Sequence, residues 1–235
     1  MTERSFSLTH LIREPRRRVE GRPPLLLLLH GLGSYEGDLF PLAELLDPRC
    51  FVVSARAPLT LQPGAYAWFN VQFLPHGLRI QPGEAEASRQ LLLRFIDEVV
   101  AAYDLDPERV YLMGFSQGAI MSCSVALTEP EKVAGVIAMS GRILPEIADR
   151  TAAPERLRGL PFIVVHGIYD DVLPIAYGRA SRNLLAGLPV HLTYHEYRIG
   201  HHTSPESLRD IAEWLTARLD GPRRLATAAP AADEA

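Results

Sequence analysis

The 235-residue sequence predicts an α/β fold, in which a doubly wound, mostly parallel sheet carries helices on both faces. The first observation is a set of apolar runs without polar alternation, as expected for strands that are buried on both faces. The second is that helical patterns separate most of these runs, so that strand and helix alternate along the chain. The predicted strands lie at residues 25–30, 51–53, 110–113, 133–139 and 162–165.

Three segments carry apolar residues at helical spacing. Leucines at positions 39, 42, 45 and 46 share a face of the first, and residues 88–103 and 208–219 contain the other two. Ser204 and Pro205 stand just before the third pattern, where they predict an N-cap and a proline at the first helical position. We expect all three helices to pack on the sheet through their apolar faces.

The two ends of the chain differ in what they predict. Residues 5–11 are expected to add an antiparallel strand at one edge of the sheet. No internal linker rich in Ser, Gly or Pro interrupts the chain, so residues 1–220 are predicted to form a single domain. Residues 221–235 change to Gly-Pro-Arg-Arg and an Ala/Pro-rich end, which predicts a disordered tail.

Two connections, residues 56–82 and 141–160, are unusually long. Long loops in compact domains are usually functional covers or disordered segments. The first is rich in aromatic residues, among them Trp68 and Phe69, and this favours an ordered wall of a substrate pocket. The alternative is that these aromatic rings only close a hydrophobic edge of the core.

The charge balance excludes several classes of partner. The formal net charge is -4, from 24 basic and 28 acidic residues, which provides no field to gather nucleic acid or an anionic membrane.

Arginines 16–18 and leucines 25–29 resemble a signal peptide only superficially, because the apolar run is short and no cleavage site follows. Cys50 and Cys123 form no disulfide framework. We expect a cytoplasmic protein with a small-molecule partner and no stable membrane insertion; a homodimer stays open.

The segment Gly114-Phe115-Ser116-Gln117-Gly118 directly follows an apolar strand and has the pattern of a nucleophile elbow. Its two glycines would let the strand and the next helix approach closely, while Ser116 takes a strained conformation with its hydroxyl exposed. A tight turn without a catalytic role is the alternative for this motif taken alone.

A serine nucleophile needs a base to accept its proton, and the base needs an acid to hold its tautomer. On this topology the order along the chain should be Ser, acid, His. Asp170 and Asp171 follow a predicted strand, and Asp170 is the predicted acid. His201 precedes the last helix and is the predicted base, with the adjacent His202 as a competitor. Taken singly, these could be a solvated turn and surface histidines.

The tetrahedral intermediate of acyl transfer needs hydrogen-bond donors, which backbone amides supply in this architecture. Gln117 provides one at the start of its helix, where the helix dipole also favours an anion. The glycines of His30-Gly31-Leu32-Gly33 allow an exposed amide, and Leu32 is the predicted second donor.

No cofactor or metal is expected. Glu36 occupies the position of the third glycine in a dinucleotide fingerprint, so the Gly-Leu-Gly segment does not match that motif. A metal site is the competing use of the histidines, but no spacing typical of zinc ligands appears among them. The histidines concerned are His191, His195, His201 and His202.

As a set, these motifs resemble the phospholipase/carboxylesterase family of α/β-hydrolases, which includes the acyl-protein thioesterases. The matching segments are Leu29-His30-Gly31-Leu32-Gly33-Ser34, Gly114-Phe115-Ser116-Gln117-Gly118, His166-Gly167 with Asp170 and Pro174, and Gly200-His201. The resemblance covers nearly all of residues 20–219 and implies an α/β-hydrolase fold. It places Ser116, Asp170 and His201 on the family's triad, the amides of Leu32 and Gln117 on its oxyanion hole, and Trp68 beside the acyl site. Ser34 and Ala119 look more like the bacterial carboxylesterase branch than the eukaryotic thioesterase branch.

We therefore expect a serine hydrolase that cleaves carboxylic esters of small to medium acyl chains through an acyl-enzyme intermediate. A lysophospholipase or an acyl thioesterase would use the same triad. A carbon-carbon or peptide hydrolase and a non-catalytic binding protein of the same fold are the further alternatives.

Overall fold

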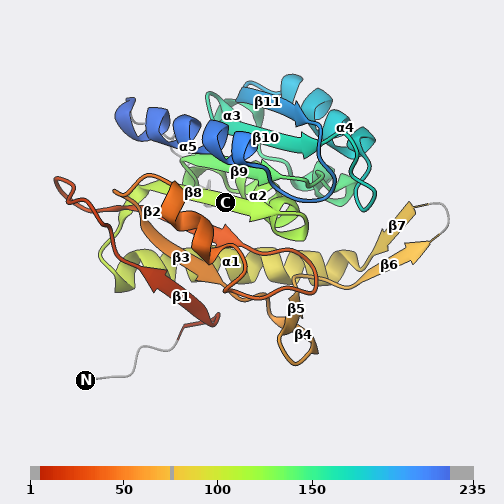
Figure 1. Ribbon diagram of the computed structural model, residues 1–235, viewed down its shortest axis with the longest axis horizontal. Coiled ribbons are helices and arrows are strands. Elements are labelled where there is room, and N and C mark those ends of the chain that lie inside the picture. The colour runs from red at the N-terminus through yellow and green to blue at the C-terminus, as the bar shows by residue number, and fades with distance from the viewer. Residues whose placement is uncertain (1–5, 75–76, 223–235) are drawn as a thin grey trace, which may run out of the picture.

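The computed structural model describes residues 6–74 and 77–222, and a seven-stranded sheet forms its centre (Figure 1). The strands are β1 (His10–Arg13), β2 (Pro24–Leu29), β3 (Phe51–Ala55), β8 (Asp106–Phe115), β9 (Gly135–Met139), β10 (Pro161–Gly167) and β11 (His191–Tyr197). Their order across the sheet is β1-β3-β2-β8-β9-β10-β11. Only β1 pairs antiparallel within this sheet, and the predicted mostly parallel arrangement is confirmed.

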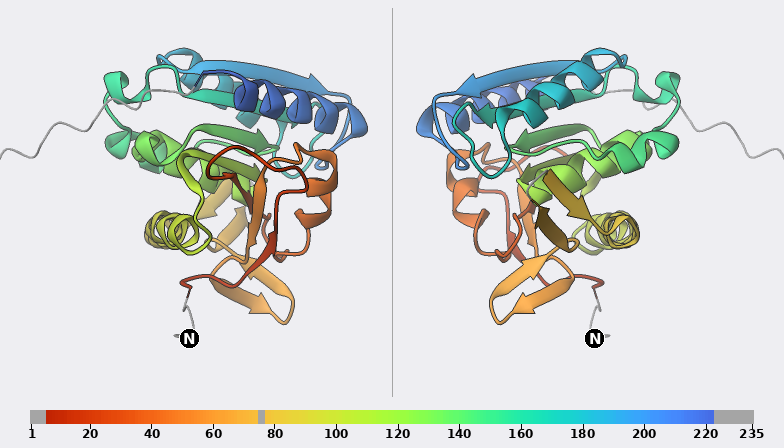
Figure 2. Two further views of the ribbon diagram at one scale, coloured as in Figure 1. Left: turned by 90° about the vertical axis from the view of Figure 1, so that its left-hand side faces the viewer. Right: turned by 90° about the vertical axis from the view of Figure 1, so that its right-hand side faces the viewer.

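Helices cover both faces of the sheet, as predicted (Figure 2). They are the 3-10 helices η1 (Phe40–Leu45), η2 (Pro130–Lys132) and η3 (Pro145–Arg150) and the α-helices α1 (Pro82–Ala102), α2 (Gln117–Thr128), α3 (Pro154–Leu157), α4 (Ile175–Ala186) and α5 (Pro205–Asp220). Buried residues of α1, α2 and α3 and Leu185 of α4 belong to the core on one face. Those of η1 and α5 belong to the core on the other face.

The leucine run of β2 shows why the strands lack alternation. Leu25, Leu27 and Leu29 belong to one core, Leu26 and Leu28 belong to the other, and all five are 0% exposed. Neighbouring side chains of a strand point to opposite faces, so a strand covered on both sides needs apolar residues throughout. Burial of each leucine stabilises the fold by about 1.5–3 kcal/mol.

The N-terminal strand begins later than predicted. Its register runs from His10 opposite Ala55 to Arg13 opposite Val52. Upstream, the backbone N–H and the hydroxyl of Ser7 both donate to the Glu98 carboxylate of α1, at 2.7 and 2.8 Å. The chain at Ser7 is therefore tied to a helix and not to the sheet.

The helical patterns at residues 88–103 and 208–219 belong to the α-helices α1 and α5, whereas the pattern at residues 39–46 does not form an α-helix. Ser204 caps α5 through a capping box, in which its hydroxyl accepts from the Ser207 N–H at 3.2 Å and the Ser207 hydroxyl accepts in return at 2.9 Å. The leucine pattern at residues 39–46 instead forms only the six-residue 3-10 helix η1, without a side-chain cap. Pro48 follows closely, and a proline disfavours helical backbone angles at the residue before it.

The two long connections are ordered where they are described. Residues 56–82 contain two antiparallel hairpins, one of β4 (Leu59–Gln62) with β5 (Ala65–Ala67) and one of β6 (Val71–Leu74) with β7 (Gly77–Ile80). The hairpin of β4 and β5 projects from the body of the molecule (Figure 1). Residues 141–160 hold η3 and α3.

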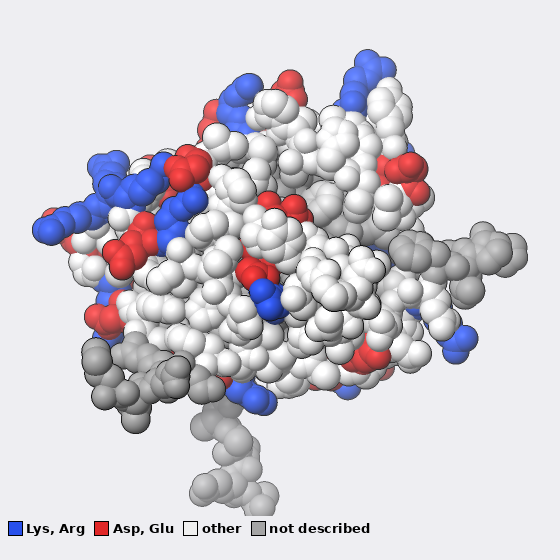
Figure 3. Space-filling model, turned by 60° about the horizontal axis from the view of Figure 1, so that its bottom comes forward, with Lys and Arg blue, Asp and Glu red and all other residues white. Residues whose placement is uncertain are grey.

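Other sequence expectations have simple outcomes. Cys50 and Cys123 are free and buried, and burial raises the pKa of each thiol to about 12. No helix among the described residues is long and apolar enough to cross a membrane. Basic and acidic side chains are interspersed on the face shown in Figure 3, and uncharged residues fill most of its centre. Residues 223–235 of the predicted tail lie outside the described residues, and the single-domain assignment stays a prediction.

Candidate active site

Ser116 stands in the turn between β8 and α2 with backbone angles of φ 54° and ψ -114°. A positive φ is unfavourable for a residue with a side chain, so the surrounding turn must hold it. A Cβ on Gly114 would lie 2.2 Å from the Gly118 carbonyl carbon, and one on Gly118 would lie 1.9 Å from the Leu29 carbonyl oxygen. Both positions therefore require glycine, and this close approach aims the serine at the carboxyl edge of the sheet.

The three predicted triad residues converge at that edge. His201 places its Nε2 atom 3.0 Å from the Ser116 hydroxyl oxygen and its Nδ1 atom 2.7 Å from Oδ2 of Asp170. A carboxylate only accepts hydrogen bonds, so Nδ1 carries a proton and the neutral ring presents a lone pair at Nε2. This arrangement can receive a proton from the serine hydroxyl.

Asp170 is held by its own loop. Its Oδ1 atom accepts hydrogen bonds from the Val172 and Leu173 amides at 3.0 and 2.7 Å, and its side chain is 0% exposed. The loops that carry the acid and the base touch, since a Cβ on Gly167 would lie 2.3 Å from the Gly200 carbonyl oxygen. Close contact of the two glycines fixes the spacing between Asp170 and the loop of the base.

The choice between the two adjacent histidines is visible in their contacts. His202 is exposed, and its Nδ1 atom lies 2.9 Å from the carbonyl oxygen of Thr203. His201 has the contacts to Ser116 and Asp170, and its side chain is 15% exposed. The geometry thus favours His201 over His202 as the base.

A second imidazole lies behind the acid. His166 is fully buried at the end of β10, with its Nε2 atom 2.7 Å from the Leu173 carbonyl oxygen and 3.4 Å from Oδ2 of Asp170. Because the carbonyl only accepts, Nε2 carries the proton. Burial lowers the pKa of His166, so the ring is neutral near neutral pH.

The two predicted oxyanion donors face open space next to the serine. Leu32 and Gln117 both line the cavity beside Ser116, and neither backbone N–H has an acceptor within residues 6–74 and 77–222. Gly33 has a φ of 76° and donates its N–H to the Tyr66 carbonyl at 2.8 Å, which turns the loop after β2 and leaves the Leu32 amide exposed.

That cavity has a volume of about 230 Å³ and is mainly apolar. Its apolar lining includes Phe69, Val71, Ile80, Phe115, Ile120 and Val172, and its charged lining residues are Asp38 and Arg142. Drug-sized ligands usually occupy pockets of roughly 300–1,000 Å³, so this cavity suits a smaller group. A further cavity of about 360 Å³ lies where β8, β10 and β11 begin, at the opposite edge of the sheet from Ser116.

Comparisons with known proteins show the family of this chain. The phospholipase/carboxylesterase family matches residues 12–219, which is most of the chain. The chain belongs to the phospholipase/carboxylesterase family. Acyl-protein thioesterase 1 of Mycosarcoma maydis is 30% identical, over 88% of this chain and 96% of that protein. Carboxylesterase SOBER1 of Arabidopsis thaliana is 27% identical, over 83% of this chain and 91% of that protein.

The solved structure of the Bacillus cereus carboxylesterase is similar to this one with a TM-score of 0.78. Its sequence is 23% identical, and the alignment covers 90% of this chain and 94% of that chain. The likeness confirms the α/β-hydrolase fold for this member of the phospholipase/carboxylesterase family.

The two aromatic residues predicted for the pocket have different places in this family member. Phe69 lines the cavity, whereas Trp68 is 0% exposed and is not among the lining residues. The Trp68 indole N–H donates to the His30 carbonyl at 3.0 Å, and its backbone N–H donates to Oε1 of Gln117 at 2.7 Å. The pocket prediction for Trp68 is therefore wrong: its two N–H groups bind the His30 carbonyl and the Gln117 side chain, next to the predicted oxyanion donors.

His30 supports the same loop from the other side. Its Nε2 atom accepts from the Ala57 N–H at 3.0 Å, so Nδ1 must carry the proton that it donates to the Gly31 carbonyl at 2.7 Å. Burial lowers the pKa of His30, which keeps the ring neutral. No sequence pattern singled out this role.

The metal alternative receives no support from the geometry. Within the described ranges, no group of three or more His, Cys, Asp or Glu side chains is arranged to hold a metal ion. His191 and His195 lie on β11, whereas the imidazole of His201 points to Ser116 and Asp170.

Proposed function

We propose that the protein hydrolyses carboxylic esters through a covalent acyl-enzyme, with Ser116 as nucleophile, His201 as base and Asp170 as the acid that orients it. The observation that carries the proposal is the continuous hydrogen-bond chain from Ser116 through His201 to Asp170, with distances of 3.0 and 2.7 Å. Membership of the phospholipase/carboxylesterase family supports the reaction class.

In the acylation step, the Ser116 oxygen attacks the acyl carbon while His201 Nε2 takes the hydroxyl proton. The substrate carbonyl oxygen becomes negative and accepts hydrogen bonds from the amides of Leu32 and Gln117. The bond to the leaving alcohol then breaks, and His201 returns its proton to that oxygen.

In the deacylation step, a water molecule attacks the acyl carbon and gives a proton to His201. The bond from the acyl carbon to Ser116 breaks, and the same proton returns to the serine oxygen. The products are one carboxylic acid and one alcohol. Asp170 accepts a hydrogen bond from the His201 Nδ1–H throughout and stabilises the imidazolium that forms in each step.

The size of the cavity favours esters with small to medium acyl chains. The cavity is lined by Phe69, Val71 and Ile120 next to Ser116. An acyl chain bound there is transferred from water to an apolar wall, which favours binding. A series of para-nitrophenyl esters of increasing acyl length tests this: kcat/KM should fall for chains that exceed the cavity.

Thioester hydrolysis is the second candidate, because the relative from Mycosarcoma maydis carries the name acyl-protein thioesterase 1. The same attack on an acyl carbon would release a thiol in place of an alcohol. Matched oxygen and sulfur esters of one acyl chain separate the two activities.

Labelling with a fluorophosphonate probe tests the proposal itself. We expect one phosphonylated residue by intact mass and peptide mapping, at Ser116, with parallel loss of ester hydrolysis. A folded protein that neither reacts with the probe nor hydrolyses any ester would point to a non-catalytic binding protein.

A further inference from the structure

Among the described residues, Arg142 is the one arginine or lysine that lines the cavity beside Ser116. The chain reaches this position directly from the end of β9. A Cβ on Gly141 would lie 2.5 Å from the Ala119 Cβ and 3.2 Å from the Ser116 carbonyl oxygen, so the backbone there runs against the elbow. The next residue, Arg142, is thereby placed in the wall of the cavity.

Arg142 has no carboxylate partner within the described part of the chain. Its guanidinium carbon lies 5.2 Å from the centre of the Tyr177 ring, and its Nε atom is buried without a hydrogen-bond acceptor. A buried donor without an acceptor is unfavourable, so contacts within the described residues do not fully satisfy the guanidinium group.

Two other half-buried or buried arginines, Arg56 and Arg89, have carboxylate partners. Arg56 forms two hydrogen bonds with the Glu36 carboxylate, and Arg89 forms two with Glu86 at 2.9 and 2.8 Å. Arg142 differs from them in having an aromatic ring beside it and a cavity in place of a carboxylate.

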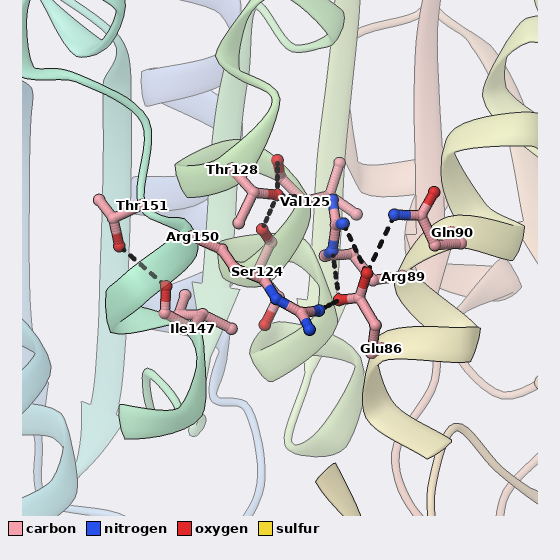
Figure 4. Close-up of polar contacts among 9 residues, drawn as sticks. All are labelled: Glu86, Arg89, Gln90, Ser124, Val125, Thr128, Ile147, Arg150 and Thr151. Carbon is pink, nitrogen blue, oxygen red and sulfur yellow. Dashed lines mark hydrogen bonds and ion pairs between the residues drawn. The ribbon is translucent and has the colours of Figure 1, made fainter. Parts of the chain in front are cut away.

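The segment that follows Arg142 is anchored at two points. The Ile143 N–H donates to the Ser181 hydroxyl of α4 at 3.0 Å. Further along, η3 is tied to α1, where Arg150 contacts the Glu86 carboxylate at 2.5 Å (Figure 4). Glu86 also holds Arg89, and the Arg89 guanidinium contacts the Thr128 hydroxyl of α2 at 2.8 Å. A cation on such an anchored segment is pre-organised for binding.

The surroundings specify the charge of the group that would pair with Arg142. Most of the lining is apolar, where a charge-assisted hydrogen bond is stronger than in water. Asp38 is the other charged lining residue; it is exposed, accepts from the Ser34 hydroxyl at 2.7 Å and forms no ion pair with Arg142. The cavity lining holds one arginine and one aspartate, so a singly charged anion is favoured over a dianionic phosphate, which Asp38 would repel more strongly.

We propose that the preferred ester substrates carry a carboxylate, which binds Arg142 while the ester carbonyl lies at Ser116. This inference rests on the ester hydrolysis proposed above and names its substrate class: half-esters of dicarboxylic acids, or esters of hydroxy acids. Arg142 is then a specificity-determining residue, and the planar guanidinium offers two donors to the carboxylate.

The test compares kcat/KM for each ester that carries a carboxylate with kcat/KM for the matching ester that carries an uncharged carboxamide. Monoethyl adipate and ethyl adipamate place the group on the acyl side, and para-acetoxybenzoate and para-acetoxybenzamide place it on the alcohol side. The readout is the ratio of kcat/KM for the acid over that for the amide within one variant, so a general loss of activity cancels. para-Acetoxyphenyl phosphate is the dianionic comparison.

The variants are Arg142→Gln, Arg142→Lys and the matched control Arg182→Gln. Arg182 lies 5.3 Å from the Tyr194 ring centre but outside the cavity lining. In the wild-type protein, we expect the ratio to exceed one for one of the two ester pairs. For that pair the ratio should fall at least about tenfold in Arg142→Gln and by less in Arg142→Lys. Arg182→Gln should keep the wild-type ratio.

The proposal is overturned if the wild-type ratio is one or less for both ester pairs, or if Arg142→Gln keeps the wild-type ratio. It is also overturned if para-acetoxyphenyl phosphate is a better substrate than the carboxylate esters. Should Arg142→Gln fail to fold, the wild-type ratio must fall between about 0.05 and 0.5 M salt, and a constant ratio overturns the proposal. Failure of the general hydrolase assignment is distinct, because then the carboxamide esters are not hydrolysed either.

Discussion

The imidazole of His166 lies 3.4 Å from the carboxylate of Asp170, and both side chains are 0% exposed. The ring donates its Nε2–H to the Leu173 carbonyl, and the Leu173 amide in turn donates to Asp170 Oδ1. His166 therefore supports the loop that presents the acid, and it is not among the residues that line the cavity beside Ser116.

Replacement of His166 should reduce turnover more than substrate binding. His166→Gln is expected to lower kcat by about 10- to 100-fold with a smaller change in KM, because small misplacements of catalytic groups cost rate. Steady-state kinetics on a neutral ester measure this split. His195→Gln on β11 is the control, since its ring contact is with Tyr197 and not with the triad. A kcat within threefold of wild type would show that the loop does not depend on His166.

The glycine after the serine should be indispensable for stability. Gly118→Ala would place a Cβ 1.9 Å from the Leu29 carbonyl oxygen, and we expect a loss of about 3 kcal/mol or more in the free energy of unfolding. The matched control is Gly83→Ala in α1, where no atom lies within 4 Å of the added Cβ. That variant should be as stable as wild type or more stable by up to about 1 kcal/mol. Urea denaturation measures both, and equal stabilities of the two variants would contradict the packing described.

Acid should destabilise the fold before the carboxylates titrate. Burial lowers the pKa of both His30 and His166 in the folded state, so the unfolded chain binds more protons below its histidine pKa of about 6.5. Their contribution is fully present above that pH and is lost as pH falls toward the folded pKa values. The slope can reach about 1.4 kcal/mol per pH unit for each histidine.

Urea denaturation between about pH 7.5 and 5 measures that slope. A hydrogen bond to Arg89 lowers the pKa of Glu86 to about 2, and the resulting stabilisation is lost mainly below this window, as pH falls from the unfolded value of about 4.3. His166→Gln should reduce the slope by about half. A stability that stays constant from pH 7 to 5 would mean that neither histidine is kept neutral by the fold.

Much of the architecture was predictable because its signals are local. The unbroken leucines of β2 identify a strand covered on both faces, and the elbow glycines identify the close approach at Ser116. The order of Asp170 and His201 along the chain follows from the topology, which brings the carboxyl ends of parallel strands to one edge. Adjacent His201 and His202 could be separated only by the direction of their rings.

Other features depend on contacts between distant segments. Trp68 and Phe69 are neighbours in an aromatic loop, yet one is engaged with the His30 carbonyl and the other lines the cavity. Nothing in the local sequence distinguishes them. Arg142 gave no signal either, because an arginine after a strand is usually a solvated surface residue, and its lack of a carboxylate partner appears only in three dimensions.

The coupling between Ser116 and His201 tests the central claim most directly. kcat/KM on a para-nitrophenyl ester is measured for Ser116→Ala, His201→Ala and the double variant, with folding checked by urea denaturation. We predict that each single change lowers the rate by about 10³- to 10⁶-fold and that the double variant is no slower than the singles, since the two side chains act as one unit. Independent losses that multiply in the double variant, or ester hydrolysis that survives in Ser116→Ala, would contradict it.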